Sequence, residues 1–187
     1  MTLEDDIKLE FEKRSIKLRK VKKGSFARTI NHLRRGLANI IPDTYLGLRI
    51  KNTILPLGYT GSNCKVRNGF RFHYGKNIYI CDNVFINYDC LFLDSDIIFI
   101  EENVAIGPHV DIYTISHFSN WEGKFDSSRK PVYIKKNSWV GGHSTILPGI
   151  VIGEGSIVGA GSVVTNSIEP YTLYAGNPAI KKKDLIR

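Results

Sequence analysis

The sequence predicts a mainly β protein in which short strands wind into a stacked, three-sided coil. The first observation behind this is a large apolar residue at every sixth position within three runs, which fill twelve of twelve places: Ile80, Ile86 and Phe92; Ile100, Ile106 and Ile112; and Ile134, Val140, Ile146, Ile152, Val158 and Val164. The second is the period itself. Six residues differ from the roughly 3.6 of a helix and the roughly 2 of a half-buried strand, and are typical of a parallel β-helix built from hexapeptide repeats.

Composition limits the class of protein. The 187 residues are enough for one domain with a substantial core. No run of about eighteen apolar residues predicts a membrane span, and the acidic start MTLEDDIKLE does not resemble a secretory signal. The three cysteines have neither metal-binding nor redox spacing, and their odd number argues against a disulfide framework. We therefore expect a cytoplasmic, reducing location.

The net charge of +8 is concentrated near the N-terminus, because residues 1–51 hold 13 Lys or Arg against 6 Asp or Glu. Within residues 1–42 we expect a basic helical segment of two helices, one over 3–22 that is broken at Arg14 and a second that Ser25 caps and Pro42 ends. Such a segment is either a solvated helical face or a contact for an anionic partner, such as a membrane surface or a lipid-linked phosphate.

Residues 43–167 are expected to form the β-helix, with irregular first coils over 43–75. The step from Phe92 to Ile100 is eight residues instead of six, so two extra residues should bulge outward there. A polar and aromatic stretch over 114–131 interrupts the repeat and predicts a loop that protrudes from one corner, where repeat proteins often place function. Residues 168–187 are expected to cap the end of the coil.

Four strings identify a resemblance that covers about 60% of the chain: FINYDCLFLD (85–94), VAIGPHVDIYTISH (104–117), NSWVGGHSTILPGIVIGEGSIVGAGSVVT (137–165) and YAGNPA (174–179). They resemble hexapeptide-repeat O-acetyltransferases that act on galactosides, maltose, nodulation factors and bacterial surface polysaccharides. The resemblance implies a left-handed β-helix, a homotrimer with sites between subunits, and acetyl-CoA as co-substrate without a metal.

His117 matches the catalytic histidine of the family's Thr-x-His motif. A sugar hydroxyl is a poor nucleophile until its proton is removed, and imidazole changes its charge near neutral pH, so this side chain suits a general base. The resemblance implies substrate-binding roles for four further residues, although a turn or a wall of a coil would also explain them: Asn87, Asp94, Trp139 and His73. Ser95 stands where galactoside enzymes often have a second acidic residue, which argues against a simple galactoside acceptor.

The same resemblance implies where acetyl-CoA is held. The backbone N–H of Gly142 faces the thioester oxygen in the family, where a fixed donor stabilises developing negative charge. Ala160 and Thr165 lie along the pantetheine arm. Asn166 replaces the family's nucleotide-binding lysine, and Lys183, with its two lysine neighbours, supplies cations for the phosphates.

Three alternatives stay open. His109, His143 and His117 raise a zinc site, but their spacing does not resemble that of the hexapeptide-repeat carbonic anhydrases. The chain is otherwise an N-acetyltransferase of an amino sugar or antibiotic, or a non-catalytic trimeric scaffold. Nucleic-acid binding is not expected, because the basic segment has no interleaved aromatic residues.

Overall fold

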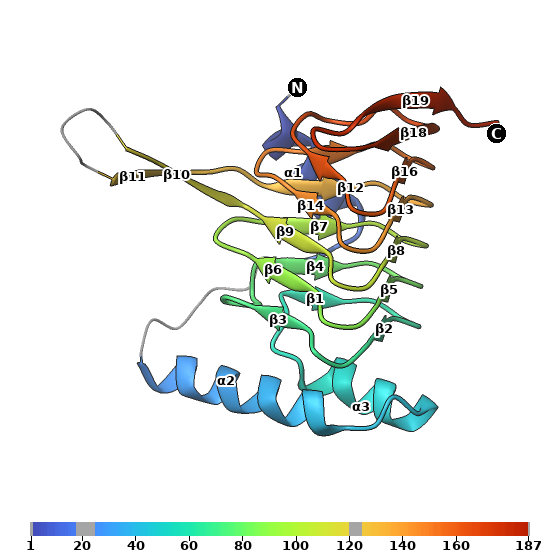
Figure 1. The fold of residues 1–187 in the computed structure, drawn as a ribbon. Helices are drawn as coiled ribbons and strands as arrows, with labels where there is room; N and C mark the ends of the chain where they lie inside the picture. Colours follow the sequence, from blue (N-terminus) through green and yellow to red (C-terminus); the bar gives the residue numbers. More distant parts are fainter. Residues whose placement is uncertain (1, 18–24, 120–124, 187) are drawn as a thin grey trace.

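The computed structural model describes residues 2–17, 25–119 and 125–186, and it is a parallel β-helix of about five turns with three helices. Figure 1 shows short strands stacked into a prism, with α2 and α3 lying across the end where the first coils are. A two-stranded arm, β10 and β11, leaves the prism at one corner. The predicted fold class is confirmed.

Each coil contributes one strand to each of three parallel sheets. Sheet A contains β1 (Tyr59–Thr60), β4 (Ile78–Ile80), β7 (Ile98–Ile100), β12 (Val132–Ile134) and β15 (Val151–Ile152). Sheet B contains β2 (Lys65–Val66), β5 (Phe85–Ile86), β8 (Ala105–Ile106), β13 (Trp139–Val140), β16 (Ile157–Val158) and β18 (Thr172–Ala175). Sheet C contains β3 (Arg71–Phe72), β6 (Leu91–Leu93), β9 (Asp111–Tyr113), β14 (Thr145–Ile146) and β17 (Val163–Val164).

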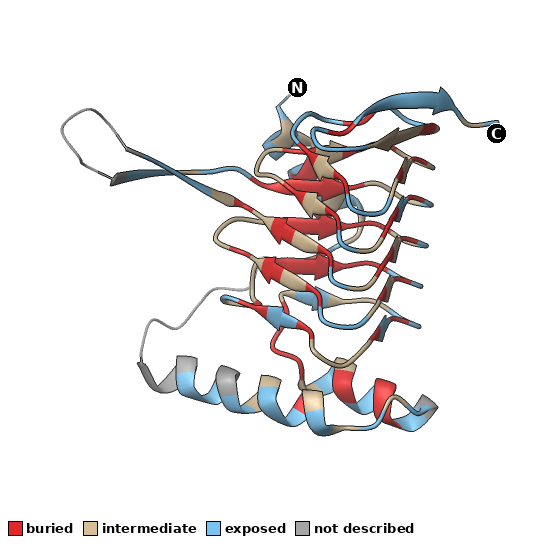
Figure 2. Ribbon diagram, viewed as in Figure 1, coloured by how far each residue is buried: buried red, intermediate tan, exposed pale blue. Residues whose placement is uncertain are grey.

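The six-residue period builds the core of the prism. All twelve predicted positions are at most 1% exposed. In Figure 2 the buried segments recur at the same place in each successive coil. Except for β18, the strands named above are only two or three residues long, so their stability comes from stacking, because each coil bonds the backbone of the coils above and below.

Asparagine supplies the left-handed turn between sheets A and B, and Asn83 and Asn103 have φ of 58° there. Asn63 and Asn137 occupy the same place in other coils, with φ of 59° and 60°. Their side chains bond along the stack, since Asn63 Nδ2 donates to Asn83 Oδ1 and Asn103 Nδ2 donates to Asn137 Oδ1, both at 3.2 Å.

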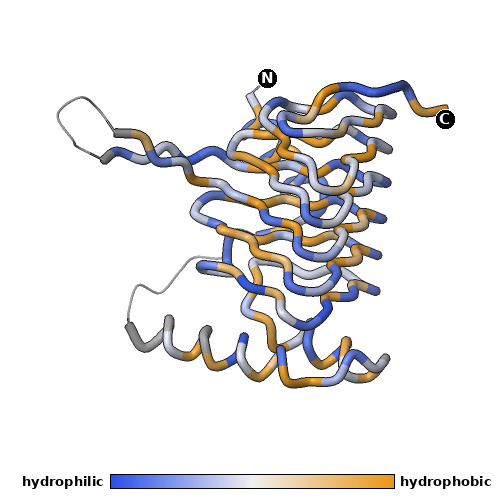
Figure 3. Tube along the Cα trace, viewed as in Figure 1, coloured by the Kyte–Doolittle hydropathy of each residue, from blue (hydrophilic) through white to orange (hydrophobic). Residues whose placement is uncertain are grey.

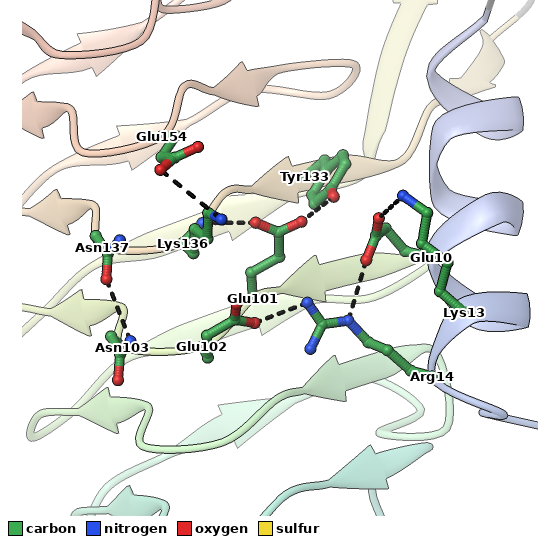
Figure 4. A network of polar contacts seen from close by, with 10 residues as sticks. All are labelled: Glu10, Lys13, Arg14, Glu101, Glu102, Asn103, Tyr133, Lys136, Asn137 and Glu154. Atoms are coloured by element: carbon green, nitrogen blue, oxygen red, sulfur yellow. Dashed lines mark hydrogen bonds and ion pairs between the residues drawn. The ribbon is translucent and has the colours of Figure 1, made fainter.

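Helix α1 (Leu3–Lys13) covers the outer face of sheet A. It ends immediately before Arg14, as expected, and residues 18–24 of the predicted first helix lie outside the described residues. The ring of Phe11 packs on Tyr79 and Phe99 at centroid distances of 4.6 and 5.3 Å. Figure 4 shows the polar contacts beside it, in which Arg14 pairs with Glu102 of the prism at 2.7 Å.

Glu101, the residue before Glu102, is buried. It accepts hydrogen bonds from the hydroxyl of Tyr133 and from the backbone N–H of Lys136 at 2.7 Å (Figure 4). Sheet A is therefore closed by a helix and a polar network, which leaves sheets B and C as the open sides of the prism.

Helices α2 (Ser25–Ile40) and α3 (Tyr45–Ile54) cap the first coil. The expectation of irregular coils from residue 43 is wrong over 45–54, because α3 occupies this stretch and the first strand begins at Tyr59. Lys51 of α3 is buried, where its ammonium group bonds Asp43 and Asn68 Oδ1, the latter at 2.5 Å. A buried lysine with two polar partners thus packs at this end of the prism.

At the other end, β18 continues sheet B and β19 (Ile180–Asp184) pairs with it in antiparallel fashion. Figure 3 shows the contrast along the chain, since hydrophobic stretches recur through the prism whereas β19 is largely hydrophilic. Among the helices of the described residues, none is long and apolar enough to cross a membrane.

Candidate active site

The sequence-predicted site residues lie mainly at two edges of the prism. The B–C edge comprises the corners between sheets B and C, at residues 67–70, 87–90, 107–110, 141–144 and 159–162. The C–A edge comprises the corners between sheets C and A, at residues 73–77, 94–97, 114–131, 147–150 and 165–167. Sheet C lies between the two edges.

His117 lies on the arm that leaves the C–A edge. The predicted loop over 114–131 is instead a β-hairpin in its described parts, with β10 (Ile115–Ser119) antiparallel to β11 (Phe125–Arg129) and residues 120–124 outside the described residues. His117 is therefore in the middle of β10, opposite Ser127, and it does not close the repeat strand β9. Its side chain is exposed.

Thr114 fixes the base of this arm, a role that sequence analysis missed. Its buried hydroxyl donates to the carbonyl of Leu93 at 2.7 Å and accepts from the backbone N–H of Asp96 at 2.8 Å. The backbone N–H of Lys130 donates to the carbonyl of Thr114 at 3.0 Å and closes the hairpin. His117 thus stands three residues beyond a rigid anchor, which gives an exposed imidazole a defined position.

Asp94 holds the neighbouring corner of the C–A edge. Its carboxylate is fully buried and accepts from the backbone N–H groups of His73, Tyr74 and Asn77 at 3.0, 2.7 and 3.3 Å. Burial raises the pKa of this carboxyl above its ordinary value, against the opposing effect of these bonds. The extra residues of the eight-residue step therefore do not all bulge outward, because Asp94 points inward and supports the corner that carries the exposed side chain of His73.

Asn87 and Trp139 lie around the B–C edge. The side-chain Oδ1 of Asn87 accepts from the backbone N–H of Tyr88 at 2.9 Å, while its Nδ2 has no hydrogen-bond partner among the described residues. Trp139 stands half exposed on the open face of sheet B, in register with Ala105 and Ile157. One amide group and one indole ring are thus available to a ligand on this side.

The predicted thioester donor, the N–H of Gly142, is also at the B–C edge. Both neighbouring amides are paired, since Gly141 donates to Val158 and His143 donates to Pro108, each at 2.8 Å. Within the described residues the N–H of Gly142 has no such partner. A Cβ on Gly141 would lie 2.5 Å from the backbone nitrogen of Ala160, so Gly141 serves the close stacking of the coils.

The remaining predicted acetyl-CoA residues are spread over the molecule. Ala160 is exposed at the B–C edge, one coil beyond Gly142. Thr165 and Asn166 are exposed at the C–A edge, on the other side of strand β17. Lys183 is exposed in β19, paired with Leu173, whereas Lys181 is held by Glu169 and Asp184, each at 2.8 Å.

His109 and His143, two of the three residues in the zinc alternative, form a stacked pair with ring centroids 4.6 Å apart. Both are exposed at the B–C edge. Over the described ranges, no three His, Cys, Asp or Glu side chains gather as a metal site would require.

A single chain therefore does not bring all of the predicted site together. The predicted base, His117, belongs to the C–A edge, and the predicted thioester donor, the N–H of Gly142, belongs to the B–C edge. Four residues of sheet C and its corners, 161–164, separate Ala160 from Thr165, a span of at most about 17 Å of extended chain. One chain thus presents an exposed imidazole at one edge and, within the described residues, an N–H without a backbone partner beside small residues at the other.

Comparison with known proteins identifies relatives along most of the chain. Residues 131–166 match the family model described as bacterial transferase hexapeptide (six repeats). A Schizosaccharomyces pombe protein, provisionally named an acetyltransferase, is 43% identical over 110 residues, or 58% of this chain and 53% of that protein. A Saccharomyces cerevisiae protein of the same provisional name is 36% identical over 157 residues, or 76% of this chain and 80% of that protein. The alignment thus spans about half of the first relative and most of the second.

Three solved structures share the fold. A maltose O-acetyltransferase from Clostridium difficile 630 is 34% identical, with a TM-score of 0.78 and coverage of 88% of this chain and 90% of that one. A hexapeptide-repeat acetyltransferase from Vibrio cholerae in complex with acetyl coenzyme A is 28% identical, with a TM-score of 0.76 and coverage of 94% and 98%. A galactoside acetyltransferase in complex with coenzyme A is 26% identical, with a TM-score of 0.79 and coverage of 100% and 92%.

Proposed function

The chain belongs to the hexapeptide-repeat acetyltransferases, and from that membership we propose that it transfers the acetyl group of acetyl-CoA to a hydroxyl group of a sugar. The observation that carries the proposal is the match to the maltose O-acetyltransferase over nearly the whole chain, together with an exposed histidine on an anchored arm. Relatives with acetyl coenzyme A or coenzyme A bound support the choice of donor.

In this mechanism His117 removes the proton from the acceptor hydroxyl as its oxygen attacks the thioester carbonyl carbon. The N–H of Gly142 stabilises the negative charge that develops on the carbonyl oxygen. The carbon–sulfur bond then breaks, the protonated imidazole returns its proton to the departing thiolate, and the products are an acetyl ester and free CoA. No covalent intermediate on the protein is required.

We place the acceptor near Asn87, Trp139 and His73, with Asp94 acting through the corner that it supports. The exposed Nδ2 of Asn87 suits a hydrogen bond to a sugar hydroxyl, and the face of Trp139 suits the apolar side of a sugar ring. The exposed side chain of Lys183 suits a phosphate of acetyl-CoA. We propose a surface polysaccharide or its precursor as the acceptor class.

We further propose a homotrimer in which the C–A edge of one chain meets the B–C edge of the next. The separation of base and donor in one chain supports this, because a closed ring of three such contacts assembles three equal sites. The test is complementation between two inactive variants, His117→Ala and Ala160→Trp. Mixed oligomers should regain activity only if each site takes its base and its donor groove from different chains, and no recovery would contradict the shared site.

The main test is an acceptor screen with acetyl-CoA, in which the release of CoA thiol is followed across simple sugars, nucleotide sugars and oligosaccharides. With an active acceptor, His117→Ala should lower kcat by at least about 100-fold while the thermal midpoint and CoA binding are unchanged. Ser116→Ala is the matched control, because adjacent side chains of a strand point to opposite faces. Full activity of His117→Ala, or acetylation of amines alone, would refute the proposed chemistry.

We also propose a cytoplasmic location. Cys64, Cys81 and Cys90 are all free and buried, which suits a reducing compartment. Fractionation of the cells that make the protein would test this, and recovery outside the cytoplasmic and inner-membrane fractions would contradict it.

A further inference from the structure

The helical cap has one side that packs on the prism and one side that does not. The inner side is formed by Ala38 of α2 and by Leu48 and Lys51 of α3, all of which are buried. Two bonds fix the rotation of α2, since Arg35 donates to the carbonyl of Phe72 at 2.8 Å and the N–H of Gly69 donates to Asn39 Oδ1 at 3.2 Å. The outer side of α2 therefore cannot turn inward without breaking these contacts.

The outer side is apolar. We define the cap face as five exposed side chains on the side of each helix away from the prism: Leu33, Leu37, Ile40, Leu46 and Ile50. The spacings of three and four residues place them in one stripe on each helix. Leu33 is 63% exposed and Ile40 is 79% exposed. In Figure 2 much of α2 is exposed, and in Figure 3 the same helix carries hydrophobic segments.

Charge around the cap face indicates what covers it. The cap helices contain no Asp or Glu, and besides the buried Lys51 their described side chains include three arginines: Arg34, Arg35 and Arg49. Two copies of the chain placed face to face would bring these cations together and repel each other. An anionic partner removes that repulsion, and a lipid bilayer also accepts a continuous apolar stripe.

We propose that the cap face lies on an anionic membrane surface, with α2 and α3 in the plane of the interface and the cap end of the prism against the lipid. The apolar stripes insert between headgroups and the flanking cations contact lipid phosphates. This inference does not depend on acetyl transfer. It places the protein where lipid-linked acceptors are found, so it also narrows the acceptors to be screened.

The size of the effect follows from the exposure of the leucines. Burial of a leucine side chain favours transfer from water in proportion to the apolar area that is covered, and Leu33 and Leu37 are already partly covered. Replacing each by serine should therefore weaken partitioning by roughly fivefold, and replacing both by roughly 25-fold. Raising the salt concentration should weaken binding further, because it screens the cations.

The test is flotation of the full-length protein with vesicles of phosphatidylcholine alone or mixed with phosphatidylglycerol. We expect binding to the anionic vesicles only, loss of binding at high salt, and the weakening above for Leu33→Ser/Leu37→Ser. Ile180→Ser is the matched control, because this residue is 57% exposed in β19 at the other end of the prism. If the double variant does not fold, Leu46→Ser/Ile50→Ser tests the same face on α3.

Two results would overturn the inference. One is the absence of binding to anionic vesicles at low salt. The other is a change in the mass of the oligomer when Leu33 and Leu37 are replaced, which would make the cap face a contact between protein chains. Vesicle binding and CoA release are measured on the same protein. If the protein releases CoA with a free sugar but does not bind vesicles, the membrane proposal fails while the proposed enzyme activity stands.

Discussion

Replacing Asp94 distinguishes a structural carboxylate from one that binds an acceptor. The Asp94→Ala change removes the acceptor of three backbone N–H groups, those of His73, Tyr74 and Asn77. Bonds to a charged acceptor contribute about 1.5–3 kcal/mol each, but the change also removes the cost of burying the carboxylate. We therefore expect the free energy of unfolding to fall by about 3 kcal/mol, which is less than the sum of the bonds.

The assay is thermal unfolding at fixed protein concentration, because the midpoint of an oligomer depends on concentration. For a chain of this length the loss corresponds to a fall in the midpoint of roughly 10 °C. Asp96→Ala is the matched control in the same corner, since among the described residues its carboxylate bonds only the adjacent N–H of Ile97, and it should cost less than about 1 kcal/mol. An unchanged midpoint for Asp94→Ala with a raised KM for the acceptor would refute the structural role.

The pH dependence of stability gives Asp94 a second signature. Its pKa in the folded protein is raised above the ordinary value of 3.8 by burial, so the unfolded chain loses this proton first as the pH rises. The contribution of Asp94 to stability is then fully present below pH 3.8 and declines as the pH rises through the folded pKa. Asp94→Asn should lack this decline, and identical acid profiles for both proteins would contradict it.

Three further predictions concern parts of the molecule away from the site. Phe11→Ala should cost about 3 kcal/mol of contact with sheet A and release α1, which hydrogen exchange would detect as faster exchange in residues 3–13 with protected prism strands. Lys51→Ala should lower stability by about 3–5 kcal/mol in denaturant unfolding, because it leaves Asp43 without its buried partner. The native protein should not react with a disulfide thiol reagent until it unfolds, because Cys64, Cys81 and Cys90 are all buried. Burial also raises the pKa of Cys81 to about 12 and the pKa of Cys90 to about 11.

The repeat could be predicted from sequence because each of its units is local. A core aliphatic such as Ile106 recurs six residues after the last, and the corner between carries its own turn signal, such as Asn103 with its left-handed backbone. No distant contact is needed to recognise either feature. The core and the turns therefore follow from short stretches of chain.

Helix α3 of the cap, unlike α2, could not be predicted from the sequence, because it reverses the usual pattern. Its apolar residues Leu46 and Ile50 face outward, while Lys51 faces inward to Asp43 and Asn68. A periodicity argument assigns apolar residues to the core, so it gives no indication of a helix held by a buried cation.

The candidate site was only partly accessible to sequence reasoning. The family motif indicated His117, but the strand that carries it has no alternating apolar pattern and so was expected to be a loop. The role of Thr114 depends on its contact with the preceding coil at Leu93, and that contact exists only once the register is known. The family resemblance identified candidate site side chains such as His117, whereas the residues that support them, such as Thr114, could be identified only from the structure.

The closed base of the arm has a consequence for how this molecule can diversify. Since Lys130 returns to Thr114 before the coil resumes, amino acids added to or deleted from the tip leave the stacking of every layer unaltered. What the arm contacts can therefore change within one short segment without any change in the paired strands of the prism.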